Sequence, residues 1–470
     1  MTTERFALHV PDATLEDLRE RLANRDLSWL SDFVPPERGD LPDLRADERL
    51  ATSYANENYS VSGSPSAWRY GIDPEILEDV LKYFETDFLD NWREKEAKLN
   101  ELPQYIAEVE PGVKIHYIHA RCAAGDQALT VFLLHGWPST LFDHHKVVPH
   151  LIARGYNVIV PSIPGFGYSQ ITGDLVPHSG AVRTAELYDK LACEVLGLPA
   201  YAVQGGDWGG AIGTIMAARS SHCIALHLNL PVAMVTKRFS LLNANKVARL
   251  AAYALAPSWT LGPREASAAE NLVAFLRTNT GYFLQHVTKP ATLGHALRES
   301  PAGLVAWIME KFYICTDFRS TGNVFDAVSK DEILTTVMMF WATDSIASSM
   351  AFYRHCRNLA DELPDFVSVP TALLVAPCEP LQMPRRLMDL SFNVRRYTEL
   401  DVGGHFLPME QPELLANDLA AFLKEVGAVS PTSRPVRAEL SSLQMLRASL
   451  PLVSLPVMVG GAAALIRSRL

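Results

Sequence analysis

Residues 205–210 read Gly-Gly-Asp-Trp-Gly-Gly, and this stretch constrains the fold more than any other part of the chain. The run 201–204 before it predicts the end of a buried strand, and 211–219 after it predicts a helix. Glycines two residues on either side of Asp207 permit a strained strand-to-helix turn that exposes the central side chain. Because helix N-termini favour negative charge, this turn presents Asp207 as a nucleophile. From this stretch alone, an acid that merely caps a helix fits equally well.

A carboxylate nucleophile narrows the chemistry. A serine that attacks an alkyl carbon forms an ether, which water does not easily cleave. A carboxylate instead forms an ester, whose carbonyl an activated water can attack through a tetrahedral oxyanion. Asp207 is therefore suited to substrates that are opened at an sp³ carbon, such as epoxides and alkyl halides.

Four further segments each combine a predicted strand with a distinctive turn. They are 131–134 before His-Gly-Trp-Pro (135–138), 156–161 before Pro-Gly-Phe-Gly-Tyr-Ser (164–169), 371–376 before Pro-Cys-Glu-Pro (377–380), and 397–402 before Gly-Gly-His-Phe (403–406). The chain order of nucleophile, acid and histidine is that of α/β-hydrolases. In that fold, two backbone N–H groups form the oxyanion hole, and the corresponding positions here are Trp137 and Trp208.

These motifs resemble those of epoxide hydrolases of the microsomal and fungal type, over roughly residues 6–426. The resemblance rests on His-Gly-Trp-Pro, Gly-Gly-Asp-Trp-Gly and Gly-Gly-His-Phe, and on Glu379, which matches the family's acid. It implies an α/β-hydrolase fold with a mostly parallel sheet, a helical cap insertion and a helical N-terminal extension. It also implies hydrolysis of an epoxide to a vicinal diol, with a small apolar epoxide and water as the reactants.

The resemblance further implies two cap tyrosines that donate hydrogen bonds to the epoxide oxygen. Tyr282, in a Gly-Tyr segment, and Tyr353, in a Phe-Tyr segment, occupy the matching positions. Such donors are required because an alkoxide is a poor leaving group. With 15 tyrosines in the chain, packing within the cap is the alternative for each.

The expected division of labour follows from these assignments. Asp207 attacks the less hindered ring carbon, and His405, oriented by Glu379, activates the water that cleaves the ester. Asp401 lies nearer His405 in sequence and is an alternative orienting acid. We favour Glu379 because it leaves a strand end on the same edge as the other catalytic loops.

Three other functions remain open. A haloalkane dehalogenase shares the aspartate and its ester but needs halide donors instead of the tyrosine pair. An epoxide-opening cyclase keeps the same machinery and uses the substrate's own hydroxyl. A non-catalytic ligand-binding protein of the same fold is the third. The apolar cap segment 272–276 favours an apolar substrate but fits cap core equally well, and the natural epoxide, in detoxification or secondary metabolism, stays open.

Composition excludes several partners and cofactors. A net charge of −11, from 42 basic and 53 acidic residues, argues against nucleic acid and anionic membrane surfaces. Six cysteines without C-x-x-C spacing indicate reduced intracellular thiols. The pairs His116/His119 and His144/His145 lack companion ligands, so we expect surface or loop positions and no metal. We expect no nicotinamide or other cofactor, because Gly-Phe-Gly at 165–167 lacks the full dinucleotide fingerprint.

Five segments are expected. These are an N-terminal extension (1–105), a first core part (106–230), a helical cap (231–364), a second core part (365–430) and an apolar tail (431–470). Helices are predicted in the extension at 14–23, 74–88 and 92–99. The polar start of the chain predicts neither an N-terminal anchor nor a secretory signal.

The tail allows three interpretations. Ser468-Arg469-Leu470 resembles the peroxisomal Ser-Lys-Leu signal and would be read by a peroxisomal import receptor. The apolar run 450–466 is short and broken for a spanning helix, but a weak membrane anchor is the second interpretation. The third is a surface-packed or disordered tail, and a cytoplasmic enzyme is the alternative to a peroxisomal one. We favour the peroxisomal address; assembly as a homodimer is also open.

Overall fold

The computed structural model describes residues 3–27, 71–173, 179–231, 241–255 and 260–428. Within these residues, a central sheet of ten strands runs in the order β1-β2-β3-β5-β4-β7-β8-β9-β10, with β6 beside β3. The strands are β1 (Thr3–Phe6), β2 (Gln104–Glu110), β3 (Val113–Ala120), β4 (Thr130–Leu134), β5 (Asn157–Pro161), β6 (Gln170–Ile171), β7 (Tyr201–Gly205), β8 (Cys223–Leu228), β9 (Val367–Val375) and β10 (Phe392–Glu399).

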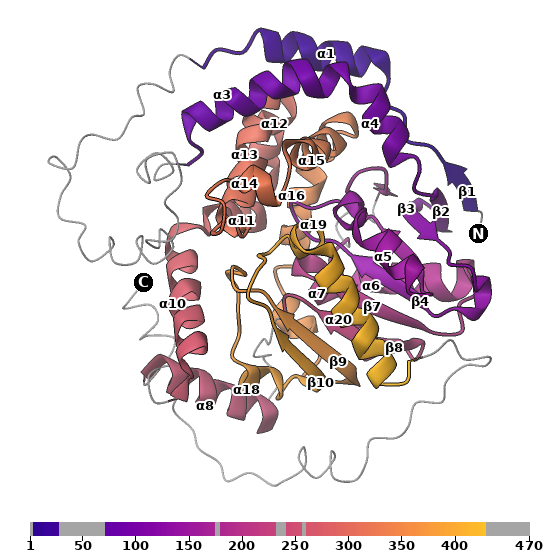
Figure 1. The fold of residues 1–470 in the computed structure, drawn as a ribbon, viewed down its shortest axis with the longest axis vertical. Helices are drawn as coiled ribbons and strands as arrows, with labels where there is room; N and C mark the ends of the chain where they lie inside the picture. The colour runs from indigo at the N-terminus through magenta and orange to yellow at the C-terminus, as the bar shows by residue number, and fades with distance from the viewer. Residues whose placement is uncertain (1–2, 28–70, 174–178, 232–240, 256–259, 429–470) are drawn as a thin grey trace, which may run out of the picture.

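In this spatial order, neighbouring strands from β1 to β5 pair antiparallel, and neighbouring strands from β5 to β10 pair parallel. Every residue of β4, β5 and β7 is buried, as expected for parallel strands covered on both faces. Helices α5 (Val147–Ala153) and α20 (Pro412–Glu425) pack together on one face, and α6 (Ala181–Lys190) and α7 (Asp207–Arg219) on the other (Figure 1). The structure confirms the expected fold class of a mostly parallel, helix-covered sheet.

Pairing in this sheet brings distant turns together. In the register of β4 and β7, Leu134 lies opposite Gly205, so both strands end at the same level. The turns that follow, 135–138 and 205–207, therefore meet at one edge. An isolated bridge between Cys378 and Gly404 likewise joins the turns after β9 and β10. The carboxyl ends of four strands thus assemble one site from four separate segments.

The N-terminal extension is helical with one addition. It contains α1 (Asp12–Ala23), α3 (Pro74–Tyr83) with a wider turn over Phe84–Phe88, and α4 (Trp92–Leu99), close to the predicted ranges. Strand β1, not predicted, adds to the sheet edge by antiparallel pairing with β2. Its four residues Thr-Glu-Arg-Phe are exposed or half-buried, so they carry no apolar alternation that would reveal a strand.

The strand before the histidine begins earlier than predicted. It spans Phe392–Glu399, whereas the sequence placed it at 397–402. This strand forms the edge of the sheet, and most of its residues are half-buried. Partial exposure accommodates charged side chains such as Arg395 and Arg396, so no apolar run marks its limits.

Between β8 and β9 lie helices that cover the carboxyl ends of the strands (Figure 1). They are α8 (Leu241–Leu255), α10 (Pro263–Thr278), α11 (Gly281–Thr288), α12 (Pro290–Glu299), α13 (Pro301–Cys315), α14 (Val324–Ala327), α15 (Lys330–Ala342), α16 (Ile346–His355) and α17 (Leu359–Glu362). The remaining short helices α18 (Arg385–Met388) and α19 (Leu407–Glu410) flank β10. Helix α1 packs on α13, so the N-terminal extension braces these covering helices from above (Figure 1).

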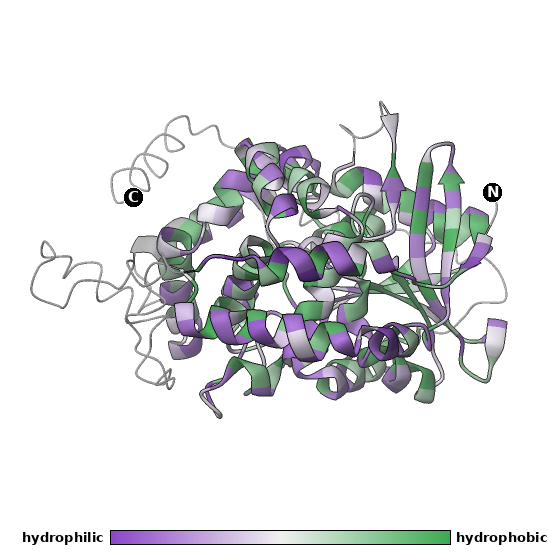
Figure 2. Cartoon of the chain, turned by 90° about the horizontal axis from the view of Figure 1, so that it is seen from above, coloured by the Kyte–Doolittle hydropathy of each residue, from purple (hydrophilic) through white to green (hydrophobic). Residues whose placement is uncertain are grey.

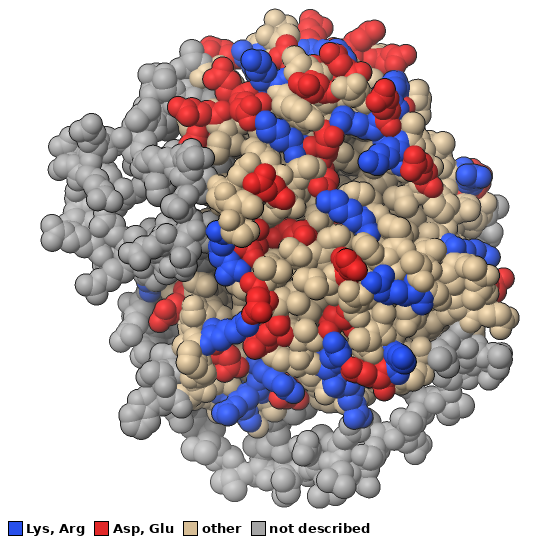
Figure 3. Space-filling model, in the orientation of Figure 1, with Lys and Arg blue, Asp and Glu red and all other residues tan. Residues whose placement is uncertain are grey.

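Surface composition agrees with the layered arrangement. Figure 2 shows hydrophilic and hydrophobic residues alternating along the outer helices, so each has an apolar side to bury. Acidic and basic side chains are interspersed over the face drawn in Figure 3. No helix among the described residues combines the length and apolar character needed to cross a membrane. The tail segments 450–466 and 468–470 lie outside the described residues.

Candidate active site

Asp207 is the first residue of α7 and occupies a strained turn. Its φ of 47° lies in the left-handed region, which non-glycine residues seldom adopt. The helix begins at Asp207 itself, four residues earlier than predicted, so its N-terminus faces the carboxylate. Gly209 permits the turn to pack against β4, because a Cβ there would lie 2.1 Å from the Leu134 carbonyl oxygen. The strain and close approach together explain the glycines that flank the acid.

One oxygen of the carboxylate is already held by the backbone. The Trp137 N–H donates a hydrogen bond to Oδ1 of Asp207 at 2.8 Å, and the Trp208 N–H also stabilises the charged form. Gly136 allows this approach, since a Cβ at that position would lie 2.2 Å from the same oxygen. Oδ1 is thus held by the Trp137 N–H, whereas Oδ2 lies 3.9 Å from Nε2 of His405.

The histidine and its partner acid complete the core of the site. His405 Nδ1 lies 2.8 Å from Oε2 of Glu379, and a carboxylate only accepts, so Nδ1 carries the proton. Glu379 is 4% exposed, and its Oε1 accepts the Leu381 N–H at 3.1 Å. Asp401, the alternative orienting acid, is exposed to solvent. His405 therefore donates this hydrogen bond to Glu379 and not to Asp401.

Burial and charge shift the pKa values of both reacting groups. Burial raises the pKa of the Asp207 carboxyl above its ordinary value, although His405 and the two backbone N–H groups partly offset this effect. Burial opposes protonation of His405, but the charges of Glu379 and Asp207 outweigh it and raise its pKa to about 9. His405 is therefore a cation at neutral pH as long as both carboxylates are ionised.

The histidine loop is bonded to the covering helices. The His405 N–H donates to the Cys315 carbonyl at 2.8 Å, at the end of α13. The Gly403 N–H donates to Oδ2 of Asp317 at 2.8 Å, and the Asp317 N–H donates to Oε2 of Glu410 at 2.8 Å. Three hydrogen bonds thus fix the loop that carries His405 against the end of α13 and the segment that follows it.

Both expected tyrosines reach the same region from different helices. Tyr282 on α11 stacks on the Trp137 ring at 5.5 Å, and Tyr353 on α16 packs edge-on against that ring at 5.9 Å. The two tyrosine rings lie 6.2 Å apart. The Oη of Tyr353 is buried, and the hydroxyl groups of Tyr282 and Tyr353 lie close enough to influence each other's pKa. Of the two tyrosines, Tyr282 lines the pocket described below, whereas Tyr353 is 2% exposed and lies outside that lining.

Burial keeps both phenols protonated. It raises the pKa of Tyr282 and of Tyr353 well above the ordinary value of 10, and the negative charge of Asp207 raises both further. The influence of Asp207 on both hydroxyls indicates that the carboxylate and the phenols share one low-dielectric space. Each phenol is accordingly a hydrogen-bond donor over the physiological pH range.

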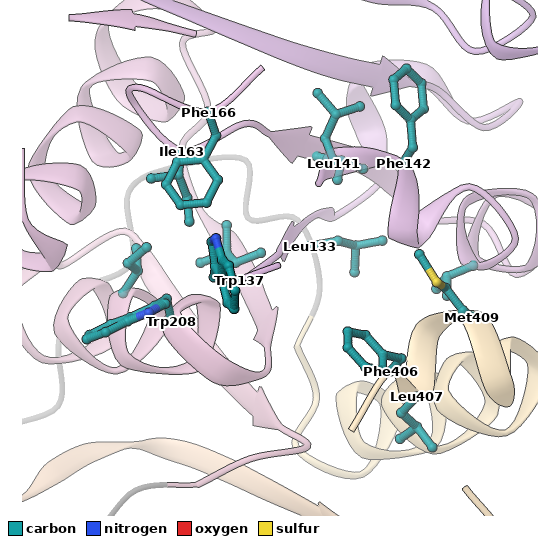
Figure 4. Close-up of a cluster of buried hydrophobic side chains, with 14 of the residues drawn as sticks. Leu133, Trp137, Leu141, Phe142, Ile163, Phe166, Trp208, Phe406, Leu407 and Met409 are labelled. Atoms are coloured by element: carbon teal, nitrogen blue, oxygen red, sulfur yellow. The ribbon is translucent and has the colours of Figure 1, made fainter. Parts of the chain in front are cut away.

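The ring of Trp137 is the centre of an aromatic cluster. Figure 4 shows it among buried side chains, with Phe166 to one side and Trp208 to another. Its Nε1 donates to Ser349 Oγ at 3.2 Å, which joins it to α16. His286, which the sequence did not single out, packs edge-on against Trp137 at 4.5 Å, and burial lowers its pKa to about 3. The neutral imidazole of His286 therefore packs against both tyrosine rings.

A pocket opens directly onto Asp207 and His405. Its wall includes Tyr282 and Lys311 and a set of largely apolar residues. That set comprises Trp137, Pro138, Phe275, Ile314, Cys315, Pro380, Leu381 and Phe406, together with Asn279. Within the segment 272–276, Phe275 faces the pocket, whereas Val273 and Leu276 are 42% and 48% exposed.

The histidine pairs occupy different places from those expected. His116 and His119 lie in β3, His144 ends a short helical turn (Leu141–His144) after β4, and all three are buried, whereas surface or loop positions were expected. Burial lowers the pKa of His116 to about 3 and that of His119 to about 4. Among the described residues, no group of three or more His, Cys, Asp or Glu is arranged to hold a metal ion.

Comparison with known proteins agrees with this architecture. The sheet, the strained aspartate turn and the later histidine define an α/β-hydrolase, and the family model of the alpha/beta hydrolase fold matches residues 130–288. A second model, epoxide hydrolase N terminus, matches residues 3–144. The chain belongs to the epoxide hydrolases of the microsomal and fungal type, as the relatives below show.

Two curated relatives and one solved structure illustrate the similarity. Epoxide hydrolase 1 of Oryctolagus cuniculus is 32% identical over 383 residues, covering 76% of this chain and 82% of that protein. Juvenile hormone epoxide hydrolase 2 of Ctenocephalides felis is 32% identical over 382 residues, covering 76% and 78%. The crystal structure of juvenile hormone epoxide hydrolase from the silkworm Bombyx mori superposes with a TM-score of 0.74, at 27% identity, covering 91% of this chain and 95% of that one.

Proposed function

We propose that this protein hydrolyses epoxides to vicinal diols through a covalent ester on Asp207. The observation that carries the proposal is the placement of the carboxylate. Its Oδ1 is bonded by the Trp137 N–H, while Tyr282 from the cap shares the pocket with it. A nucleophile and a proton donor on one pocket are what opening a strained ether requires.

Ring opening would use Oδ2 of Asp207 and the tyrosine pair. Oδ2 forms a bond to one ring carbon, and the C–O bond to that carbon breaks as its electron pair moves to the epoxide oxygen. Hydrogen bonds from Tyr282 and Tyr353 stabilise this oxygen, which takes the phenol proton of Tyr282 and becomes a hydroxyl, leaving a phenolate that solvent later reprotonates. The placement of the Tyr353 ring beside the rings of Trp137 and Tyr282 supports its assignment as one of the donors.

Ester cleavage would use His405 and Glu379. A water molecule loses a proton to Nε2 of His405 and attacks the Asp207 carbonyl carbon, and the resulting oxyanion is Oδ1. The Trp137 hydrogen bond to that oxygen is already formed in the resting site, so little reorganisation is needed. Glu379 holds the imidazole orientation and stabilises its cation. Collapse releases the diol, and solvent returns the transferred protons to their starting groups.

The pocket favours an apolar substrate. Phe275, Ile314 and Leu381 contribute apolar wall, and residues 231–364 would act as the cap that excludes water during alkylation. These features support a hydrophobic epoxide as the substrate.

A labelled single turnover tests the proposal. The protein in excess is mixed with a hydrophobic epoxide in H₂¹⁸O. The ester route places ¹⁸O in Asp207 and leaves the first diol unlabelled, whereas direct attack of water labels the diol. A parallel incubation with a bromoalkane tests the dehalogenase alternative. Consumption of the bromoalkane without consumption of any epoxide would replace the proposed function by dehalogenation.

We also infer that the terminal Ser468-Arg469-Leu470 is a peroxisomal address. The inference rests on its similarity to the Ser-Lys-Leu signal. A receptor reads such a tripeptide independently of the enzyme's chemistry, so this proposal and the proposed activity stand or fall separately.

A further inference from the structure

Lys311 carries a charge into an otherwise apolar wall of the pocket. It lies on α13 within an apolar helix, and the residue is 6% exposed. Burying an ammonium is costly unless nearby groups compensate for the lost water. The side chains around Lys311 must therefore stabilise its charge in the pocket that also contains Asp207 and His405.

Two aromatic faces and one acid surround the ammonium. Nζ of Lys311 lies 4.7 Å from the centre of the Tyr282 ring and 5.1 Å from that of Trp307. It also donates a hydrogen bond to Oε1 of Glu310 at 2.5 Å. The Glu310 side chain is 26% exposed, so water screens this acid more than it screens the ring contacts. The cation thus acts on Tyr282 through a poorly solvated space.

We propose that Lys311 is a positioning residue that strengthens Tyr282 as the donor to the epoxide oxygen. This rests on the proposed epoxide hydrolysis. As the ring opens, the Tyr282 proton moves toward the alkoxide and negative charge accumulates on the phenol oxygen and ring. A cation over the face of that ring stabilises the accumulating charge more than it stabilises the neutral phenol.

The surroundings of Tyr282 make such support necessary. Burial and the Asp207 carboxylate both raise its pKa, so the phenol is a weak acid when alkylation begins. Lys311 supplies positive charge on the ring face, and His286 on the neighbouring side stays neutral because burial lowers its pKa to about 3. Lys311 is accordingly the cation of the described pocket wall that contacts this ring.

A double-mutant cycle tests the proposal. All proteins carry His405→Gln, so the ester accumulates and mass spectrometry follows alkylation of Asp207 directly. Lys311→Met is expected to slow alkylation about tenfold when Tyr282 is present. In the Tyr282→Phe background, which keeps the aromatic ring and loses the hydroxyl, the same change is expected to have less than a twofold effect. Lys311→Arg, which keeps the charge, should remain within a few fold of the parent.

Matched variants separate a role in positioning from a role in folding. Lys330 also lies over two rings, those of Tyr83 and Phe325 at 5.2 and 5.1 Å, and pairs with Asp79, but it lies outside the pocket wall. Lys330→Met should leave alkylation unchanged. Glu310→Gln removes the acid that neutralises Lys311 and should speed alkylation, a sign opposite to that of lost packing. This variant preserves the test if Lys311→Met does not fold.

The outcomes discriminate between the two proposals. Equal losses from Lys311→Met in both tyrosine backgrounds, or no loss in either, would overturn the role of Lys311. Slower alkylation by Glu310→Gln would also contradict it. Absence of any Asp207 adduct in the His405→Gln parent would instead defeat the proposed epoxide hydrolysis.

Discussion

Nε2 of His405 lies 3.9 Å from Oδ2 of Asp207, too far for a hydrogen bond and near enough for the two charges to interact strongly. At this separation Oδ2 of Asp207, the oxygen that we propose attacks the substrate, forms no hydrogen bond with Nε2 of His405. The same separation also makes the protonation of His405 depend on the charge of Asp207. Esterification removes that charge, so it favours release of the proton from His405 when a neutral base is next needed.

The first prediction concerns pH. In the resting protein His405 has a pKa of about 9, to which the Asp207 charge contributes. In the ester this contribution is gone, so the pKa falls below that value and the neutral base predominates at lower pH. Ester decay, followed by rapid quench and mass spectrometry from pH 5 to 10, should rise with pH through a midpoint below 9. A midpoint at or above 9, or a flat profile, would contradict the coupling.

The second prediction separates the two half-reactions. His405→Gln removes the base for ester cleavage and leaves Oδ2 of Asp207 free to attack, because no hydrogen bond joins these side chains. One equivalent of epoxide should be consumed, with its full mass added to the protein. Asp207→Asn is the control and should gain no mass. An unmodified His405→Gln protein, under conditions where the wild type turns over, would argue against a covalent ester.

The third prediction concerns the ring-opening donors. Tyr282→Phe and Tyr353→Phe should each slow alkylation about a hundredfold, since one lost oxyanion donor costs roughly 3 kcal/mol. The double variant should be almost inactive. Tyr156→Phe, outside the pocket wall, is the control and should retain the wild-type rate. Full activity in both single variants would exclude these tyrosines as the donors.

Some residues of this site are positioned by local backbone geometry and others by tertiary packing. The first kind could be predicted from the sequence, and the second kind could not. The turns around Asp207, Trp137 and His405 could be predicted because close backbone approach demands glycine at fixed spacings. Lys311 was not singled out, since its position over Tyr282 depends on how α13 meets α11. The available signal was a lysine interrupting the apolar run of α13.

The secondary structure was likewise predictable where the local sequence determines it and not where tertiary packing does. Strand β4 reads as a continuous apolar run because both of its faces are buried. Edge strands β1 and β10 were missed or displaced, because half-exposed residues alternate weakly. The surface position expected for His144 was wrong for a related reason. Its burial follows from packing of the turn after β4, which composition does not report.

The fourth prediction concerns Gly136. A methyl group at this position would lie 2.2 Å from Oδ1 of Asp207 and would force the carboxylate out of the oxyanion position. Gly136→Ala should therefore reduce alkylation at least a hundredfold, even in protein that remains folded by circular dichroism. Gly262→Ala, where a Cβ meets nothing within 4 Å, is the matched control. Comparable activity of these two variants would show that the close approach does not matter.

The fifth prediction concerns the C-terminal tripeptide. A fluorescent protein fused to the last twelve residues should co-localise with a peroxisomal marker in eukaryotic cells and become diffuse when Leu470 is removed. The deletion of residues 468–470 should leave diol formation by the full chain unchanged. Diffuse fluorescence of the intact fusion would refute the address, and membrane association independent of Leu470 would favour an anchor formed by residues 450–466.

His405 donates a hydrogen bond to Cys315 at the end of α13, and Gly403 donates one to Asp317, two residues further on. These two bonds have a consequence for engineering the protein. An engineer who wishes to alter the substrate range of such a protein could exchange its helical insertion for that of a relative. Here the loop that carries His405 is bonded to the insertion, so the insertion and this loop cannot be exchanged independently. A graft that replaces residues 301–317 alone would have to restore an acid at position 317 and hold the carbonyl of residue 315 in the same place, or the His405 loop would lose these acceptors. The smallest unit that can be recombined therefore includes the loop 403–410, although more than eighty residues separate it from the helix in the chain.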